Sequence, residues 1–334
     1  MDHVSDYTGQ GFSLGQISAY IFLILPTNVL TYIDADIGPS KNIVWVNIGR
    51  SLAESCMFLI VGRLSDLFGR RWFFIGGNCV AFIGVIVGAT AQNVNALIVA
   101  SVVYGLGECI QLSFGVAVGE LVPNKYRPMV MSVIFMTSAP IATFGPKIAR
   151  AFIQHPSLGW RWTYYLNIIV VGLTIILLFF FYHPPTFDML HERKSKRSQM
   201  KELDYVGMFL WISGPTLFLM GISWVGALLH FINSTKLSQG GGLYPWKSAA
   251  VICTIAIGGG LLILFGFWEA FGNQKYPLMP VKFFRNRGFI SLVACATVAS
   301  MFYYSAVLLW PQQVSEMYTH DVNYAGWLSV CGFL

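Results

Sequence analysis

Charged residues are scarce in this chain, and several motifs that mark enzymes and nucleotide-driven pumps are missing. Lysine, arginine, aspartate and glutamate make up 11% of the 334 residues, against about 25% in soluble domains. No G-x-x-x-x-G-K-[ST] loop is present to hold the phosphates of ATP, and no H-E-x-x-H or C-x-x-C pair occurs. The six cysteines are scattered singly within apolar runs. We therefore expect no metal, no cofactor and no enzymatic activity.

Apolar runs long enough to cross a bilayer recur along the whole chain. Hydrophobic residues make up 55% of the sequence, and one membrane span needs about 20 mostly apolar residues. The runs predict helices at residues 14–33, 43–62, 72–91, 96–118, 129–153, 163–182, 204–229, 248–271 and 288–310, and a tenth that starts near Tyr324 and stops at Leu334. The predicted fold class is an all-α polytopic membrane protein, with the lipid bilayer as its surroundings.

The position of the basic residues predicts the orientation. The formal net charge is +6, but most of the 21 lysines and arginines fall in alternate loops between the predicted helices rather than in one patch. Such loops face the cytoplasm in most membrane proteins. The pattern therefore predicts a cytoplasmic N-terminus and gives no support to a nucleic-acid partner. Asn233, in the sequon Asn233-Ser234-Thr235, falls in a predicted external loop and is a candidate for glycosylation.

A charged decapeptide joins the second and third predicted helices. Its charges cannot lie in hydrocarbon, so it is expected to turn at the membrane surface. Gly62 is expected to end one helix, Gly69 to permit a sharp turn, and Asp66 to accept hydrogen bonds from a neighbouring helix N-terminus. The candidate residues of this conformational-switch loop are Gly62, Arg63, Asp66, Gly69, Arg70 and Arg71.

The decapeptide resembles the signature loop G-x-L-a-D-r-x-G-r-k of the major facilitator superfamily. The stretches Glu120–Arg127, Gly159–Trp162 and Leu203–Gly207 resemble the fourteen-helix drug:proton antiporters, especially fungal members similar to trichothecene efflux pumps. This resemblance implies that Asp66 locks the two halves of a transporter together. It also implies a chain truncated at its C-terminal end, with a cytoplasmic N-terminus (1–13), an N-terminal six-helix bundle (14–183), a basic cytoplasmic linker (184–203), two inserted helices (204–271) and the start of the C-terminal bundle (272–334).

Two predicted helices carry polar stripes on one face. Asn47, Arg50 and Glu54 lie three and four residues apart, and charged groups at mid-helix are costly in lipid. Arg50 and Glu54 form either a structural ion pair or a cavity-lining pair that contacts substrate or protons. The second stripe holds Tyr104, Glu108 and Gln111. Glu108 is either a proton carrier or a glutamate satisfied by Arg50 or polar neighbours. These six residues are the candidate proton and substrate pathway.

The predicted helix at 129–153 contains Gly145-Pro146, Lys147 and Arg150. A Gly-Pro pair kinks a membrane helix and leaves room for close packing, and it resembles part of the antiporter signature G-x-x-x-G-P-x-x-G-G. We therefore expect a hinge formed by these four residues. Lys147 and Arg150 either snorkel to the interface or form a basic patch at the mouth of the pathway that attracts an anionic substrate.

The resemblance favours a plasma-membrane transporter that exports small, largely apolar metabolites, toxins or drugs, with protons as the coupling ion. Two alternatives stay open at this point. One is a siderophore-iron transporter of the same fold, and the other is a transport-inactive fragment or regulatory membrane protein.

Overall fold

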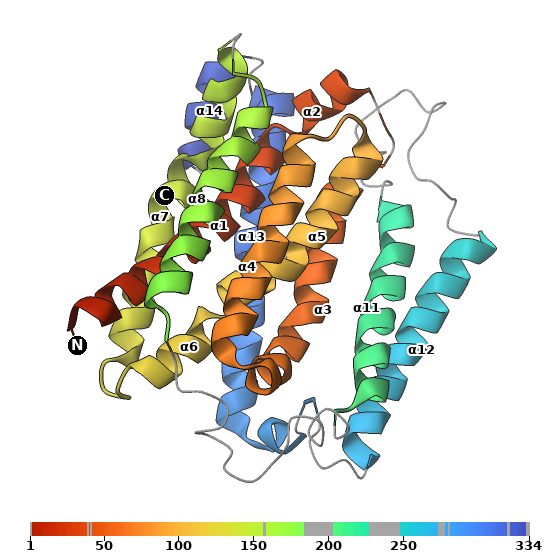
Figure 1. Ribbon diagram of the computed structural model, residues 1–334. Coiled ribbons are helices and arrows are strands. Elements are labelled where there is room, and N and C mark those ends of the chain that lie inside the picture. Colours follow the sequence, from red (N-terminus) through yellow and green to blue (C-terminus); the bar gives the residue numbers. More distant parts are fainter. Residues whose placement is uncertain are drawn as a thin grey trace. The chain divides into compact units, whose positions relative to one another are not determined.

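The computed structural model describes residues 2–38, 40, 42–155, 158–183, 203–226, 248–272, 278–279, 281–318 and 321–331. They belong to two compact units, Met1–Glu192 with Gly288–Leu334, and Arg193–Arg287. Each unit is described by itself (Figure 1). All regular elements within these ranges are helical, which confirms the all-α class.

The first unit holds most of the helices. They are α1 (Asp2–Asn28), α2 (Leu30–Ile37), α3 (Trp45–Phe68), α4 (Arg70–Ala89), α5 (Val94–Leu112), α6 (Phe114–Leu121), α7 (Arg127–Gln154), α8 (Arg161–Phe181), α13 (Arg287–Gln313), the π-helical turn η3 (Val314–Tyr318) and α14 (Val322–Cys331). Across the described chain, seven helices are long and apolar enough to cross a membrane, or eight if the bent pair α1–α2 is one span. The chain is therefore a multi-pass membrane protein, as expected.

The first predicted span is broken rather than straight. Helices α1 and α2 meet at an angle of 64°. Pro26 lies just before the break and has no N–H to donate to the preceding turn. The side chains of Thr27 and Asn28 donate instead to the carbonyls of Leu23 and Ile24, and such local bonds bend helices. The missing N–H of Pro26 and the local side-chain bonds of Thr27 and Asn28 explain why the helix breaks here.

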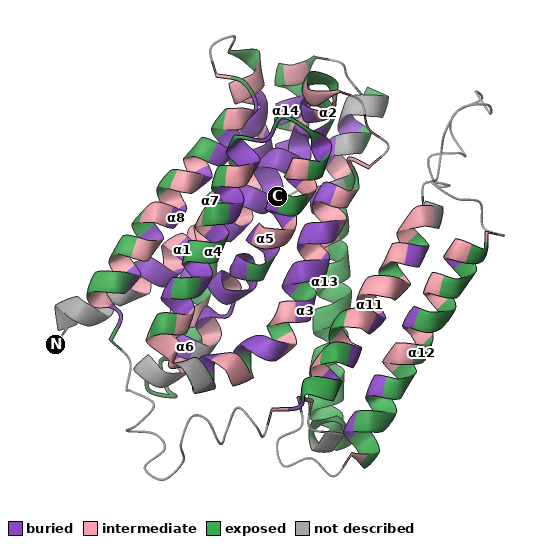
Figure 2. Cartoon of the chain, turned by 45° about the vertical axis from the view of Figure 1, so that its right-hand side comes forward, coloured by how far each residue is buried: buried purple, intermediate pink, exposed green. Residues whose placement is uncertain are grey.

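The buried side chains of the first unit gather where its helices face one another (Figure 2). Helix α1 packs against α7 and α8, α5 packs against α3 and α4, and α4 also packs against α8. Phe22 of α1 stacks on Tyr104 of α5, with ring centroids 3.7 Å apart. This core holds α3 and α5 side by side, and they carry the two polar stripes.

Glycines permit the closest of these helix crossings. At Gly105 of α5, a Cβ atom would collide with the main-chain carbonyl oxygen of Arg50 on α3. At Gly107 a Cβ atom would collide with the backbone of α4. Small residues at membrane helix interfaces let backbones approach in this way.

Gly105→Ala is expected to lower the free energy of unfolding by about 1–3 kcal/mol, because backbone atoms cannot move aside as a flexible side chain can. The matched control is Gly76→Ala on α4, where the new Cβ would meet nothing within 4 Å. That control should be neutral, or stabilising by less than about 1 kcal/mol. Equilibrium unfolding of both variants in detergent checks the difference, and equal stabilities would contradict the packing described here.

The second unit is a helical hairpin of α11 (Tyr205–Gly226) and α12 (Ala249–Phe271), followed by a 3₁₀ turn, η2 (Val281–Arg285). Asp204 precedes α11, and its carboxylate accepts hydrogen bonds from the Gly207 N–H at 2.9 Å and from the indole N–H of Trp268 on α12 at 3.1 Å. It thus caps one helix and ties it to the other. These helices lie in the region expected for the two insertions.

Several helix ends differ from the expected ones. Helix α1 starts at Asp2 rather than near residue 14, and α3 continues to Phe68 instead of ending at Gly62. Gly62 has open space around it, and glycine is tolerated within a helix at a modest cost. The sequon at Asn233 and most of the linker expected at 184–203 lie outside the described residues. The expected domain boundaries stay predictions.

Candidate functional site

The structure brings together three charged residues from the two polar stripes. On α3, Arg50 and Glu54 lie one turn apart, and Glu108 projects towards them from α5. The Arg50 Nη1 atom lies 2.6 Å from Glu108 Oε2 and 3.3 Å from Glu54 Oε2. Arg50 also donates from Nη2 to Ser51 Oγ at 3.2 Å. One guanidinium therefore joins two carboxylates on two helices, and we call these three residues the Arg50 cluster.

The Arg50 cluster is buried. Arg50 and Glu108 are each 2% exposed, and Glu54 is 7% exposed. One cation faces two carboxylates, so the three groups carry a net charge of −1 when all are ionised. Burying uncompensated charge is costly in an apolar environment. The binding of one proton to either carboxylate would remove this excess charge.

Tyr304 of α13 interacts electrostatically with the Arg50 cluster and also lines an open space. Its phenol lies within electrostatic reach of Arg50, Glu54 and Glu108. The same tyrosine lines an open hollow of about 510 Å³, whose other lining residues are Leu292, Val293, Ala296, Thr297, Ser300 and Met301. The hollow is mostly apolar. An uncharged ligand in it would therefore lie beside Tyr304.

The other three pathway residues lie outside the Arg50 cluster. The hydroxyl of Tyr104 donates to the main-chain carbonyl of Ser18 at 2.9 Å and lies 3.3 Å from Gln111 Oε1. Gln111 in turn donates to Asn78 Oδ1 of α4 at 3.0 Å. Asn47 accepts a hydrogen bond from Thr27 of α1 at 3.1 Å. These contacts join α1, α3, α4 and α5 within the apolar core.

The sequence analysis did not identify three further buried polar residues that belong to this hydrogen-bond network. Ser18, Asn78 and Asn167 are each 1% exposed or less. The Ser18 hydroxyl donates to Asn167 Oδ1 of α8 at 2.9 Å, and Asn78 donates to the carbonyl of Phe74 at 2.9 Å. Asn78 and Asn167 each stand alone in an apolar run, and that isolation was the available signal, because a buried amide needs hydrogen-bond partners.

The signature loop is shorter than expected. Gly69 adopts φ 88° between α3 and α4, a conformation that favours glycine, so the sharp turn occurs where it was predicted. Among the described residues, Asp66 accepts its hydrogen bond from the side chain of Arg70, the first residue of α4. The Asp66 carboxylate pairs with Arg70 at 2.8 Å, within the same turn. Arg71 donates to the carbonyl of Phe179 on α8 at 2.7 Å, which fixes the loop against the bundle.

Helix α7 is continuous through both of its prolines, so no break occurs at Gly145-Pro146. Close packing does occur there, because a Cβ atom at Gly145 would lie 2.7 Å from Ile24 of α1. Lys147 and Arg150 follow near the C-terminal end of α7. Arg150 is only 4% exposed, so it does not snorkel, and a hinge at these residues stays a prediction.

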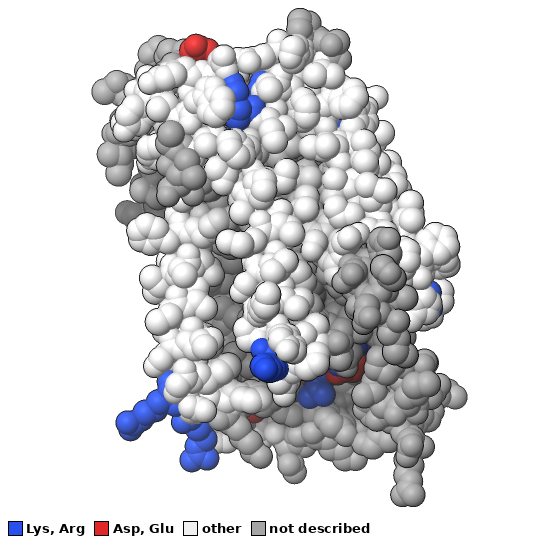
Figure 3. Space-filling view, turned by 90° about the vertical axis from the view of Figure 1, so that its left-hand side faces the viewer, with Lys and Arg blue, Asp and Glu red and all other residues white. Residues whose placement is uncertain are grey.

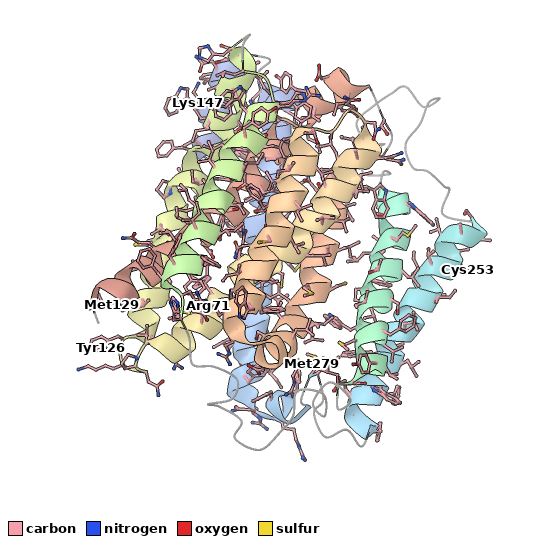
Figure 4. The ribbon with its side chains drawn as sticks, in the orientation of Figure 1. Arg71, Tyr126, Met129, Lys147, Cys253 and Met279 are labelled. Atoms are coloured by element: carbon pink, nitrogen blue, oxygen red, sulfur yellow. The ribbon has the colours of Figure 1, made fainter. Side chains whose placement is uncertain are left out.

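The charged ends of the first unit can be followed in Figures 3 and 4. Arg71 and Tyr126 lie at one end of this unit and Lys147 at the other (Figure 4). On the face drawn in Figure 3, most basic side chains lie towards the lower end, and a broad uncharged band separates them from those at the top. An uncharged band of this kind is typical of surface that contacts hydrocarbon.

Comparisons with known proteins agree with one another. A family model described as "Fungal trichothecene efflux pump (TRI12)" matches residues 4–331. The trichothecene efflux pump TRI12 of Fusarium sporotrichioides is 30% identical over 311 residues, which cover 92% of this chain and 49% of that protein. The MFS-type transporter prx5 of Penicillium rubens is 32% identical over 296 residues, which cover 87% of this chain and 48% of that protein.

Among solved structures, the partially occluded inward-open xylose transporter XylE of E. coli matches with 15% identity and a TM-score of 0.47, covering 100% of this chain and 90% of that one. The chain spans about half the length of the curated relatives it matches.

Proposed function

Since the chain belongs to the fungal trichothecene efflux pump family, we propose that the protein exports small, largely apolar toxins or metabolites in exchange for protons. The all-helical fold of the described residues, with seven candidate membrane spans, supports this proposal, in which the chain forms a major facilitator fold with an N-terminal six-helix bundle, two inserted helices and part of a C-terminal bundle. In this superfamily the two bundles rock about a central site, so that the site opens to each side in turn.

The observation that carries the proposal is the Arg50 cluster. Two buried carboxylates share one guanidinium, so one proton can be held where hydrocarbon surrounds the helices. Proton relays in transporters use buried acidic groups of this kind. We assign proton binding to the Glu54–Glu108 pair as a unit, because groups this close titrate together. Arg50 keeps the remaining carboxylate neutralised.

The signature loop provides the conformational switch in this proposal. Asp66 and Arg70 form an exposed ion pair beside Gly69. Exposed pairs are weak, contributing about 0–1 kcal/mol, so Asp66 can leave Arg70 for another partner at little cost. In the proposed cycle, Asp66 binds the C-terminal bundle in one conformation and returns to Arg70 in the other.

The proposed location is the plasma membrane, with the N-terminus in the cytoplasm. Arg70 and Arg71 begin α4, and Lys125 and Arg127 lie at the start of α7. Basic residues gathered at helix ends in this way face the cytoplasm. The TRI12 relative of Fusarium sporotrichioides is described as an efflux pump, and an exporter of toxins acts at the cell boundary.

Transport by the full-length protein in proteoliposomes tests the proposal. A labelled trichothecene should accumulate when a pH gradient is imposed across the vesicle membrane, and accumulation should stop when a protonophore removes the gradient. Empty liposomes are the control for passive entry of an apolar compound. Gradient-independent accumulation would contradict proton exchange. Uptake of a ferric siderophore without uptake of the trichothecene would contradict the substrate class.

A further inference from the structure

Two cations lie one turn apart near the C-terminal end of α7, and their surroundings differ. Lys147 is partly exposed, whereas Arg150 is 4% exposed. Within the described part of the chain, no carboxylate lies within ion-pair distance of Arg150. Its Nη2 atom donates to the main-chain carbonyl of Pro311 at 3.2 Å, and its buried Nε atom has no hydrogen-bond partner among the described residues. Arg150 is therefore a buried cation without a described counter-ion.

Among the described residues, the Arg150 guanidinium donates one hydrogen bond and its Nε–H donates none. Arginine has five N–H donors in a planar fork that matches a carboxylate or a phosphate. A single carbonyl acceptor satisfies one of them. Burial of an unpaired charge in a membrane protein is costly, so an anion bound here would lower the free energy of the folded state.

Helix α14 packs against α7 beside Lys147 and Arg150. The Lys147 ammonium contacts Asn323 Oδ1 and lies 5.4 Å from the centroid of the Trp327 ring. Gly326 of α14 lies beside both side chains. A Cβ atom there would lie 3.0 Å from Lys147 Cδ and 3.7 Å from Arg150 Cδ. Glycine at this position therefore lets α14 pack directly against the aliphatic parts of the two side chains.

We propose that Arg150 and Lys147, facing Gly326 and Trp327, bind a single anionic group, either a carboxylate or a phosphate. Arg150 contributes a bidentate contact and Lys147 a second charge, while the indole of Trp327 packs against the apolar part of the ligand. A soluble organic acid and an anionic lipid headgroup both carry this chemistry. The inference goes beyond the proposed export and does not depend on proton coupling.

A purely structural role makes a different prediction. Pro311 lies within the last turn of α13, and the π-helical turn Val314–Tyr318 follows the helix. In a structural role, Arg150 would only hold the Pro311 carbonyl, and anions would have no effect on the protein. Anion binding should therefore be measured directly rather than inferred from loss of stability.

Thermal unfolding of the full-length protein in nanodiscs tests the proposal with benzoate as the soluble probe. In neutral phosphatidylcholine discs at constant ionic strength, benzoate should raise the melting temperature in a saturable manner. The apparent Kd should rise at least about tenfold in Arg150→Gln, in keeping with the loss of a charge-assisted hydrogen bond, and less in Lys147→Gln. The matched control is Arg161→Gln, since Arg161 lies at the same end of the unit and already pairs with Asp36 at 3.5 Å.

Two further measurements distinguish the source of the anion and cover the case in which Arg150→Gln does not fold. Discs containing phosphatidic acid test the lipid source: stabilisation there without a benzoate effect, and lost in Arg150→Gln, would support binding of a lipid phosphate. If Arg150→Gln does not fold, Gly326→Leu places a side chain against Lys147 and Arg150 while keeping both charges, and it should abolish the benzoate effect by displacing them. The proposal is overturned if neither probe stabilises the wild type, or if Arg161→Gln weakens binding as much as Arg150→Gln.

Discussion

Replacing Arg50 with leucine is expected to lower the free energy of unfolding by about 3–5 kcal/mol, the usual cost of removing one partner of a buried ion pair. The variant leaves Glu54 and Glu108 facing each other, each less than 10% exposed, without the guanidinium that bridges them at 3.3 and 2.6 Å. If one of the two carboxylates binds a proton, the other is still a buried negative charge without a cation. Equilibrium unfolding of the purified full-length protein in mixed micelles measures the loss.

A double substitution separates lost charge from lost packing. Adding Glu108→Gln to Arg50→Leu removes one of the two unpaired carboxylates, so it should restore part of the stability lost in the single variant. Two residues in direct contact are expected to show such non-additive effects. If the two substitutions instead destabilise the protein additively, Arg50 acts through packing alone, and the cluster is not an electrostatic unit.

The second large effect is expected at Glu108, where glutamine should abolish transport driven by a pH gradient. Glutamine keeps the shape of the side chain and can still accept a hydrogen bond from Arg50, but it cannot bind or release the proton. Accumulation of the labelled substrate in proteoliposomes should fall to the level of empty liposomes. Exchange of labelled for unlabelled substrate without a gradient should persist, because that process needs no net proton movement.

Glu269→Gln is the matched control for this substitution. Glu269 is also a buried glutamate of a membrane helix, and it accepts a hydrogen bond from the Leu278 N–H at 3.1 Å, which glutamine can keep. It lies on α12 of the second unit. This variant should transport like the wild type. Equal losses in Glu269→Gln and Glu108→Gln would indicate a general effect of removing buried charge.

The helices could be predicted because hydrocarbon imposes length and apolarity on each span. The runs at 72–91, 163–182 and 248–271 lie within three residues of α4, α8 and α12. The turn at Gly69 followed from the freedom of glycine at positive φ. By contrast, α3 runs on past Gly62 to Phe68. One glycine does not decide a helix end when the surrounding residues favour the helix.

The candidate site was only partly predictable, because periodicity describes one helix at a time. The spacing of Arg50 and Glu54 placed them on one face, and they do form a pair. The bond from Arg50 to Glu108 spans 58 residues and depends on how α3 and α5 pack, which Gly105 permits through its missing side chain. Pairings between helices of this kind do not follow from the spacing within either helix.

Proton release on binding is the most direct test of the claim that the Arg50 cluster exchanges a proton for the transported molecule. The full-length protein in weakly buffered detergent should release protons when a trichothecene is added, and the Glu108→Gln variant should bind the compound with little or no release. Equal proton release by the two proteins would remove Glu108 from the exchange. Binding by the wild type without any proton release would contradict the account.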